Sequence, residues 1–140
     1  MTTNHRIRLN SRPVGAPTAE NYLLDEVPVP TPGEGQVLLR TLYLSLDPYM
    51  RGRMSDAKSY AKPVEVGDVM VGATVSEVVE SNAEGFTAGE IVLGYGGWQE
   101  YSVESTGHLR KIDPEIAPIS THLGVLGMPG FTAYAGLLEI

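Results

Sequence analysis

The fold is decided by residues 36–51, QVLLRTLYLSLDPYMR. From Gln36 to Leu46, apolar side chains occupy both alternating faces, which is typical of a strand that is covered on both sides. The run stops abruptly at Asp47 and Pro48, a natural N-cap and first-turn pair. We therefore expect the centre of the core in this strand, followed by a short turn that projects a tyrosine and an arginine from its end.

Further strands are expected on both sides of this run. Residues 5–9 alternate apolar and polar side chains, as a half-exposed edge strand does, and a second strand is expected near residues 22–27. Residues 91–93 and 98–103 are separated by the glycine-rich run at 94–97, for which a hairpin is the simplest interpretation. Several short strands that close on themselves predict a mainly β fold, a partly open β-barrel with short peripheral helices.

The strand expected over residues 69–79 has two unusual positions. Its alternation slips so that Val78 and Val79 are adjacent, which predicts a β-bulge. Gly72 interrupts the same run, and a glycine inside a strand predicts that another part of the molecule approaches the backbone closely.

The C-terminal segment changes character. Residues 122–126 are expected to form a short helix, and Pro129 stands at the first position of a longer one. The apolar residues of the longer helix have the spacing of an amphipathic stripe: Phe131, Tyr134, Ala135 and Leu138. The sequence ends at Ile140 with neither Gly nor Asn to cap this helix, so we expect the chain to be part of a longer protein.

Composition and charge argue against several classes of protein. The chain has 140 residues, 42% of them hydrophobic, a formal net charge of -7 and no cysteine. The negative charge opposes a nucleic-acid backbone, no apolar run is long enough for a transmembrane helix, and disulfides and thiolate zinc sites need cysteine. The polar N-terminus contains no signal-peptide segment, so the cytoplasm is the expected location.

Motifs for metal, hydrolase or dinucleotide chemistry are missing from the sequence. His5, His108 and His122 lie far apart, so no metal site is expected, and neither G-x-S-x-G nor H-E-x-x-H occurs. In residues 94–99, GYGGWQ, a glutamine replaces the third glycine of the dinucleotide fingerprint, and a strand rather than a helix follows. We therefore expect no pyrophosphate site in this chain.

Two segments could carry a ligand site, and each has a structural alternative. Residues 45–54 end a buried strand in a turn, where site residues are common; alternatively, Asp47 caps the turn and Arg51 pairs with a surface carboxylate. Residues 126–134 place a hydroxyl and backbone N–H groups at a helix N-terminus, which suits an amide or a phosphate. The alternative there is simple capping, with the aromatic residues in the core.

Three motifs in order carry a family resemblance: SLDPYMRGRM (residues 45–54), GGWQEY (96–101) and LGMPGFTAYAGLLEI (126–140). Together they resemble the zinc-independent medium-chain dehydrogenases/reductases of the leukotriene B4 dehydrogenase, prostaglandin reductase and curcumin reductase branch. The resemblance implies a GroES-like β-barrel domain in residues 1–127. Residues 128–140 would form a helix leading towards a Rossmann domain that is absent from this chain.

The resemblance also implies an activity and site residues. The complete protein is expected to be an NADPH-dependent reductase of the C=C bond of α,β-unsaturated ketones, with NADPH bound mainly by the missing domain and this chain alone inactive. Substrate contacts fall to Tyr49, Arg51 and Tyr60. Cofactor contacts fall to Tyr49, Met128 and Thr132, and no residue is expected to bind a metal.

In the expected reaction, hydride from NADPH reaches the β-carbon of the enone and a proton reaches the α-carbon. Charge on the ketone oxygen is stabilised by the ribose hydroxyl of the cofactor or by a tyrosine hydroxyl, for which Tyr49 and Tyr60 are the candidates in this chain. Zinc-binding relatives carry a Gly-His-Glu motif where this sequence has VMVG at 69–72, which agrees with zinc-free chemistry. Expected partners are a small-molecule enone and, in the complete protein, a second copy in a homodimer. The alternatives are a non-catalytic GroES-like binding or assembly module, or a reductase of quinones or enoyl thioesters.

Overall fold

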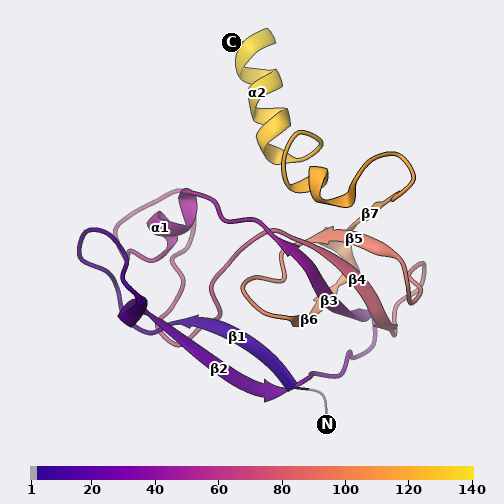
Figure 1. Cartoon of the computed structure of the whole chain (residues 1–140), viewed down its shortest axis with the longest axis horizontal. Coiled ribbons are helices and arrows are strands. Elements are labelled where there is room, and N and C mark those ends of the chain that lie inside the picture. Colours follow the sequence, from indigo (N-terminus) through magenta and orange to yellow (C-terminus); the bar gives the residue numbers. More distant parts are fainter. Residues whose placement is uncertain (1–2) are drawn as a thin grey trace.

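The computed structural model of the chain describes residues 3–140 and is mainly β (Figure 1). Its strands are β1 (Thr3–Leu9), β2 (Tyr22–Pro28), β3 (Gln36–Leu44), β4 (Thr74–Ser81), β5 (Ile91–Gly94), β6 (Tyr101–Ser105) and β7 (Arg110–Ile112). The α-helices are α1 (Tyr49–Arg53) and α2 (Met128–Leu138), and the short 3-10 turns are η1 (Ala19–Asn21), η2 (Thr106–His108) and η3 (Ile119–Leu123).

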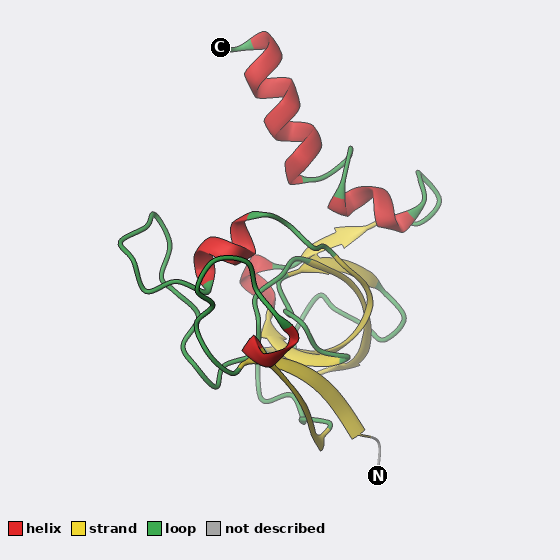
Figure 2. Ribbon diagram, turned by 60° about the vertical axis from the view of Figure 1, so that its left-hand side comes forward, coloured by secondary structure: helices red, strands yellow, loops and turns green. Residues whose placement is uncertain are grey.

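The strands form a partly open barrel. Five of them make one antiparallel sheet in the order β6-β3-β4-β5-β7, and β1 and β2 make a separate antiparallel pair. Isolated bridges from Arg6 to Gln99 and from Arg8 to Val69 tie β1 to the segments that precede β6 and β4. Figure 2 shows the strands curling around a common interior, which confirms the barrel with short peripheral helices that the sequence predicts.

The register between β3 and β4 contains the predicted bulge. Leu38 faces Glu80, but the next residue of β3, Leu39, faces Val78, so Val79 has no partner across the pair. The extra residue returns Val78 to the inner face, where it is fully buried. The slip in the alternation of the sequence is therefore confirmed as a bulge.

The core consists of two clusters of buried apolar side chains. The first lies between the sheet strands and contains Val37, Leu39, Val78 and Val92. The second joins α1 to β1 and to the segment before β4, and contains Leu9, Met50, Met54, Val64 and Met70. Tyr22 and Trp98 stack at the edge of the second cluster, with ring centroids 5.6 Å apart.

The expectation that the strand from Gln36 to Leu46 is covered on both sides is wrong for its second half. Leu42, Tyr43 and Leu46 are 37, 48 and 69% exposed. The physical reason is that β6 pairs with β3 only as far as Arg40, so beyond this point β3 has a strand neighbour on the β4 side alone.

The predicted glycine-rich hairpin is also wrong. β5 pairs with β4 and β7, whereas β6 pairs with β3, so the two strands on either side of residues 94–97 are not neighbours. The connecting segment instead crosses to residues 70–72, where Gly97 N–H donates to the Gly72 carbonyl at 3.1 Å and Trp98 N–H donates to the Met70 carbonyl at 2.8 Å. The long-range pairing partners of β5 and β6 override the local turn signal.

The C-terminal helix begins where it was predicted, with Pro129 in its first turn, but the short helix before it is η3 rather than residues 122–126. α2 stands away from the barrel in both views (Figures 1 and 2). Phe131, Tyr134 and Leu138 are exposed, so the interpretation that placed its aromatic residues in the core is wrong. Within residues 3–140, every helix is too short or too polar to cross a lipid bilayer.

Candidate functional site

A cavity of about 480 Å³ lies beyond the open end of β3. Its lining is contributed by the strand end and α1, by the segment before β4, by the loop after α1 and by the first residue of α2. The lining residues are Asp47, Tyr49, Arg53, Tyr60, Val71, Gly72, Ala73, Tyr95 and Met128. Apart from one acid and one arginine, this wall is aromatic and apolar, which is typical of a site for a small organic ligand.

The orientation of Tyr49 follows from the geometry of α1. Met50 is buried in the second core cluster and its N–H donates to the Asp47 carbonyl at 3.1 Å, which fixes the start of the turn. The cavity is lined by Tyr49 and Arg53, four residues apart, because side chains at i and i+4 share one helix face. The core therefore anchors one face of α1 and leaves the other for the cavity.

Gly72 brings the cavity wall close to α1. A methyl group at this position would lie 2.8 Å from Leu44 Cδ1, 3.1 Å from Met50 Cε and 3.3 Å from Trp98 Cδ1. The close approach predicted from the sequence is confirmed. Ala73 completes the junction, since its carbonyl accepts a hydrogen bond from Ser45 N–H at 3.0 Å.

The hydroxyl of Tyr49 is a donor over the physiological pH range. Burial, and after it the carboxylate of Asp47, raise the pKa of Tyr49 above its ordinary value of 10.0, while Arg53 opposes this shift. A phenol whose pKa is raised stays protonated at neutral pH, so Tyr49 can donate a hydrogen bond to a carbonyl oxygen in the cavity.

Tyr60 and Met128 lie on the wall of the same cavity, but they come from its outer parts. Tyr60 is on the loop after α1 and is 87% exposed, so its ring stands at the rim. Met128 begins α2 and also lines a second, more open cavity along that helix. Three of the residues predicted from the sequence, Tyr49, Tyr60 and Met128, thus surround one space.

The other two predicted residues lie elsewhere. Arg51 Nε and Nη2 donate to the Gly15 carbonyl at 3.0 and 2.8 Å, and Nη2 also donates to the Pro13 carbonyl at 3.2 Å, so this side chain holds the loop after β1. The alternative that paired Arg51 with a surface carboxylate is wrong, because its partners are carbonyl groups. Thr132 Oγ1 donates to the Met128 carbonyl at 2.8 Å within α2, and the side chain is exposed.

Sequence reasoning missed Arg53 and Tyr95. The i, i+4 spacing from Tyr49 could have found Arg53. Tyr95 lies in the crossing segment, where its N–H donates to Glu104 Oε2 at 3.3 Å, and burial raises the pKa of that carboxyl group. No local signal points to Tyr95, because its position depends on how β5 and β6 are placed in the sheet.

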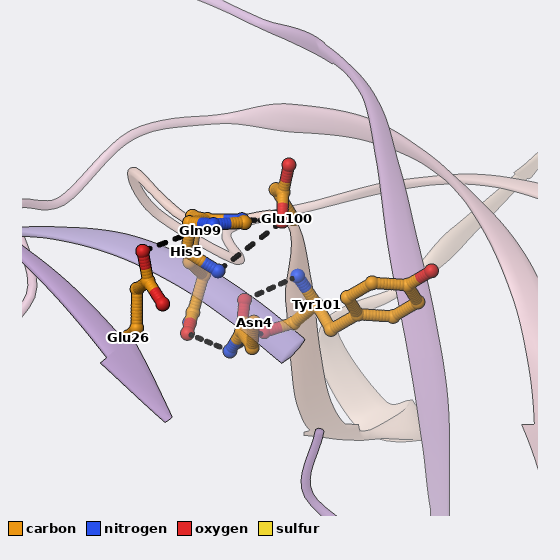
Figure 3. Close-up of polar contacts among 6 residues, drawn as sticks. All are labelled: Asn4, His5, Glu26, Gln99, Glu100 and Tyr101. Carbon is orange, nitrogen blue, oxygen red and sulfur yellow. Dashed lines mark hydrogen bonds and ion pairs between the residues drawn. The ribbon is translucent and has the colours of Figure 1, made fainter. Parts of the chain in front are cut away.

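A polar cluster outside the cavity lining has a structural role (Figure 3). His5 Nδ1 lies 2.6 Å from Glu100 Oε2, and His5 Nε2 lies 3.5 Å from Glu26 Oε1. Asn4 exchanges hydrogen bonds of 2.9 Å with the backbone of Tyr101. These contacts clamp β1 to the start of β6. Among the described residues 3–140, no group of three or more histidine, aspartate or glutamate side chains is placed to hold a metal.

Comparison of the sequence with known proteins identifies relatives of this chain. Residues 5–112 match the family described as the N-terminal domain of oxidoreductase. The NADPH-dependent curcumin reductase of Escherichia coli is 62% identical over 98% of this chain and 40% of its own length. Prostaglandin reductase 1 of Bos taurus is 43% identical over 91% of this chain and 37% of its own length.

A solved structure is similar to this chain in both sequence and fold. CurA from Vibrio vulnificus in complex with NADPH is 57% identical and superposes with a TM-score of 0.91, over 97% of this chain and 40% of that one. The chain therefore spans about 40% of the length of the relatives it matches.

Proposed function

The chain belongs to the family of oxidoreductase N-terminal domains, and on that premise we propose that it forms one wall of the active site of an NADPH-dependent reductase that acts on the C=C bond of α,β-unsaturated ketones. The observation that carries this proposal is the cavity that gathers Tyr49, Tyr60 and Met128. The names of the E. coli and Bos taurus relatives, and the NADPH held by the Vibrio protein, support the same chemistry.

The division of the chain follows from the proposal. Residues 1–127 would form the substrate-side domain, and residues 128–140 would lead into the segment that the relatives have in addition. Two features support this division: α2 begins at Met128, and it stands away from the barrel (Figure 1). Its exposed aromatic residues would then pack against the nucleotide-binding segment.

The residues of the cavity suit a flat nicotinamide ring beside the enone. Met128 offers a polarisable thioether, Tyr49 an aromatic face, and Thr132 lies one turn along α2. NADPH would supply the hydride for the β-carbon of the enone and leave as NADP⁺, while a proton from water reaches the α-carbon. The contribution of this chain is to orient the ketone of the enone beside the nicotinamide.

Tyr49 would stabilise the charge that develops on the ketone oxygen. Its hydroxyl is protonated at neutral pH, and a fixed donor in a largely apolar wall is effective where negative charge appears in the transition state. Tyr60, at the rim, would close over the substrate and hold it against Val71 and Tyr95.

The test is a chimera in which residues 1–140 replace the matching residues of the E. coli curcumin reductase. We expect this protein to oxidise NADPH only when an enone such as benzalacetone is added, at a rate within about tenfold of the E. coli parent. The isolated chain, at the same concentration, should show no enone-dependent oxidation. A folded chimera that binds NADPH but reduces no enone would contradict the proposal.

A further inference from the structure

Arg53 differs from the other arginines of the chain. Its side chain makes no ion pair and no hydrogen bond among residues 3–140, and its Nε, like those of Arg6 and Arg8, is buried without a hydrogen-bond partner. Each of the others contacts a carboxylate, a carbonyl oxygen or a histidine: Arg6, Arg8, Arg12, Arg40, Arg51 and Arg110. The arginine without a protein partner is the one that lines the cavity.

An unpaired guanidinium in such a wall is unfavourable unless a ligand completes it. The group is always charged and carries several donors in a fixed plane, and its Nε donor is removed from water without gaining a hydrogen-bond partner. Asp47 lines the same cavity but makes no ion pair with Arg53 in the described part of the chain. The remaining neighbours are tyrosines and small apolar side chains, which cannot neutralise it.

The segment around Arg53 is positive although the chain has a formal net charge of -7. Residues 51–62 contain the basic side chains of Arg51, Arg53, Lys58 and Lys62 and a single acid, Asp56. Asp56 lies 4.0 Å from the guanidinium of Arg12, outside the cavity lining. The charged residues of the lining itself are Asp47 and Arg53, and the excess of basic residues in segment 51–62 favours the approach of an anion to this part of the chain.

We propose that Arg53 binds a carboxylate on the small molecule that occupies this cavity, so that the site prefers acidic enones over neutral ones; this role rests on the proposed enone reduction. Guanidinium and carboxylate form two parallel hydrogen bonds, which is the geometry that an unpaired arginine offers. Because Arg53 and Tyr49 lie one turn apart on α1, an enone that places its ketone at Tyr49 carries its acid towards Arg53. A phosphate of the cofactor has similar chemistry, and the experiment separates the two sources.

The experiment uses the chimera with the E. coli curcumin reductase and two substrates, 4-(3-oxobut-1-enyl)benzoate and its methyl ester. We expect kcat/KM to favour the acid, and Arg53→Met to lower kcat/KM for the acid by roughly ten- to a hundredfold while changing the ester by less than about twofold. Arg53→Lys should restore part of the loss, since it keeps the charge without the planar fork. Lys58→Met removes the same charge from the exposed loop and should change the acid by less than about threefold.

Each outcome is decisive. A loss confined to the acid supports carboxylate binding by Arg53, whereas equal losses on acid and ester, or none on either, would overturn it. If Arg53→Met instead raised KM for NADPH and left the acid preference intact, the anion would belong to the cofactor and our assignment would be wrong. A wild-type chimera that reduced neither compound would overturn the proposed function itself, which separates the two failures.

Discussion

The two halves of β3 differ in what surrounds them. From Val37 to Leu39 every side chain is buried, and Val37 and Leu39 pack against Val78 and Val92 in the interior of the sheet. From Leu42 to the end of the strand the side chains are partly exposed. The cavity lining starts just beyond the strand, at Asp47. The first half contributes stability, while the second leads to Tyr49 and Arg53 on α1, whose side chains have no hydrogen-bond partner within the described residues.

This difference appears also in how polar groups are satisfied. At the start of β6 the carboxylate of Glu100 and the amide of Asn4 have close partners in the protein (Figure 3). At the cavity, neither the hydroxyl of Tyr49 nor the guanidinium of Arg53 makes a hydrogen bond within residues 3–140. The two side chains at the cavity are therefore free to contact a ligand, whereas those of the clamp already have partners in the protein.

The largest effect is expected from truncation in the buried half of β3. Leu39→Ala should lower the free energy of unfolding by about 3–4 kcal/mol, because it removes a fully buried side chain and leaves a cavity. Leu42→Ala, three residues along the same strand and 37% exposed, should cost under about 1.5 kcal/mol. Urea unfolding of both variants measures the contrast, and equal losses would show that the open end of β3 is as well packed as the closed one.

The crossing segment between β5 and β6 should be the next most sensitive. Gly97 has a φ of +75°, and a methyl group there would lie 2.5 Å from the Met70 carbonyl oxygen. Gly97→Ala should therefore cost about 2–3 kcal/mol of unfolding free energy. The control is Gly107→Ala in η2, where nothing lies within 4 Å of the added methyl, and we expect a change near zero. Thermal unfolding of the two variants side by side decides the point.

Local sequence patterns predicted the parts of the fold that depend on local physics. The bulge at Val79 follows from two adjacent apolar residues in an alternating strand, and the start of α2 follows from the fixed φ of Pro129. The hairpin between β5 and β6 failed because strand pairing is decided by long-range partners, which a glycine-rich turn cannot reveal.

Some residues of the candidate site could likewise be predicted from the sequence, and others could not. Tyr49 and Tyr60 could be predicted because a motif resemblance marks them, and both line the cavity. Arg53 lies within the motif at residues 45–54, but it stands out only when every other arginine is seen to have a partner for its side chain. Tyr95 reaches the cavity through closure of the barrel, so neither composition nor spacing could predict it.

At the cavity, removal of the Tyr49 hydroxyl should affect catalysis rather than stability. In the chimera, Tyr49→Phe should lower kcat for benzalacetone about tenfold with little change in KM, because the donor acts mainly when charge develops on the ketone oxygen. Tyr43→Phe, on the exposed end of β3 outside the cavity lining, is the matched control and should leave kcat unchanged. A rise in KM with constant kcat would contradict this role and would show that Tyr49 contributes to substrate binding alone.

The smallest effect belongs to the clamp at the start of β6. The pKa of His5 is raised above its ordinary value of 6.5, chiefly by the hydrogen bond to Glu100 and then by its charge. A raised pKa in the folded state means that His5 stabilises the fold fully below pH about 6.5, and that this contribution disappears as the pH rises through the folded-state value. Glu100, whose pKa is lowered by the same contact, sets the acid limit of this window.

The difference in unfolding free energy between the wild type and His5→Gln should therefore be largest near pH 5.5 and should shrink towards pH 8.5. It should also decrease in high salt, because the pair is exposed. If the difference between the wild type and His5→Gln did not change with pH, the clamp would hold β1 through the backbone and the neutral hydrogen bonds of Asn4 rather than through charge.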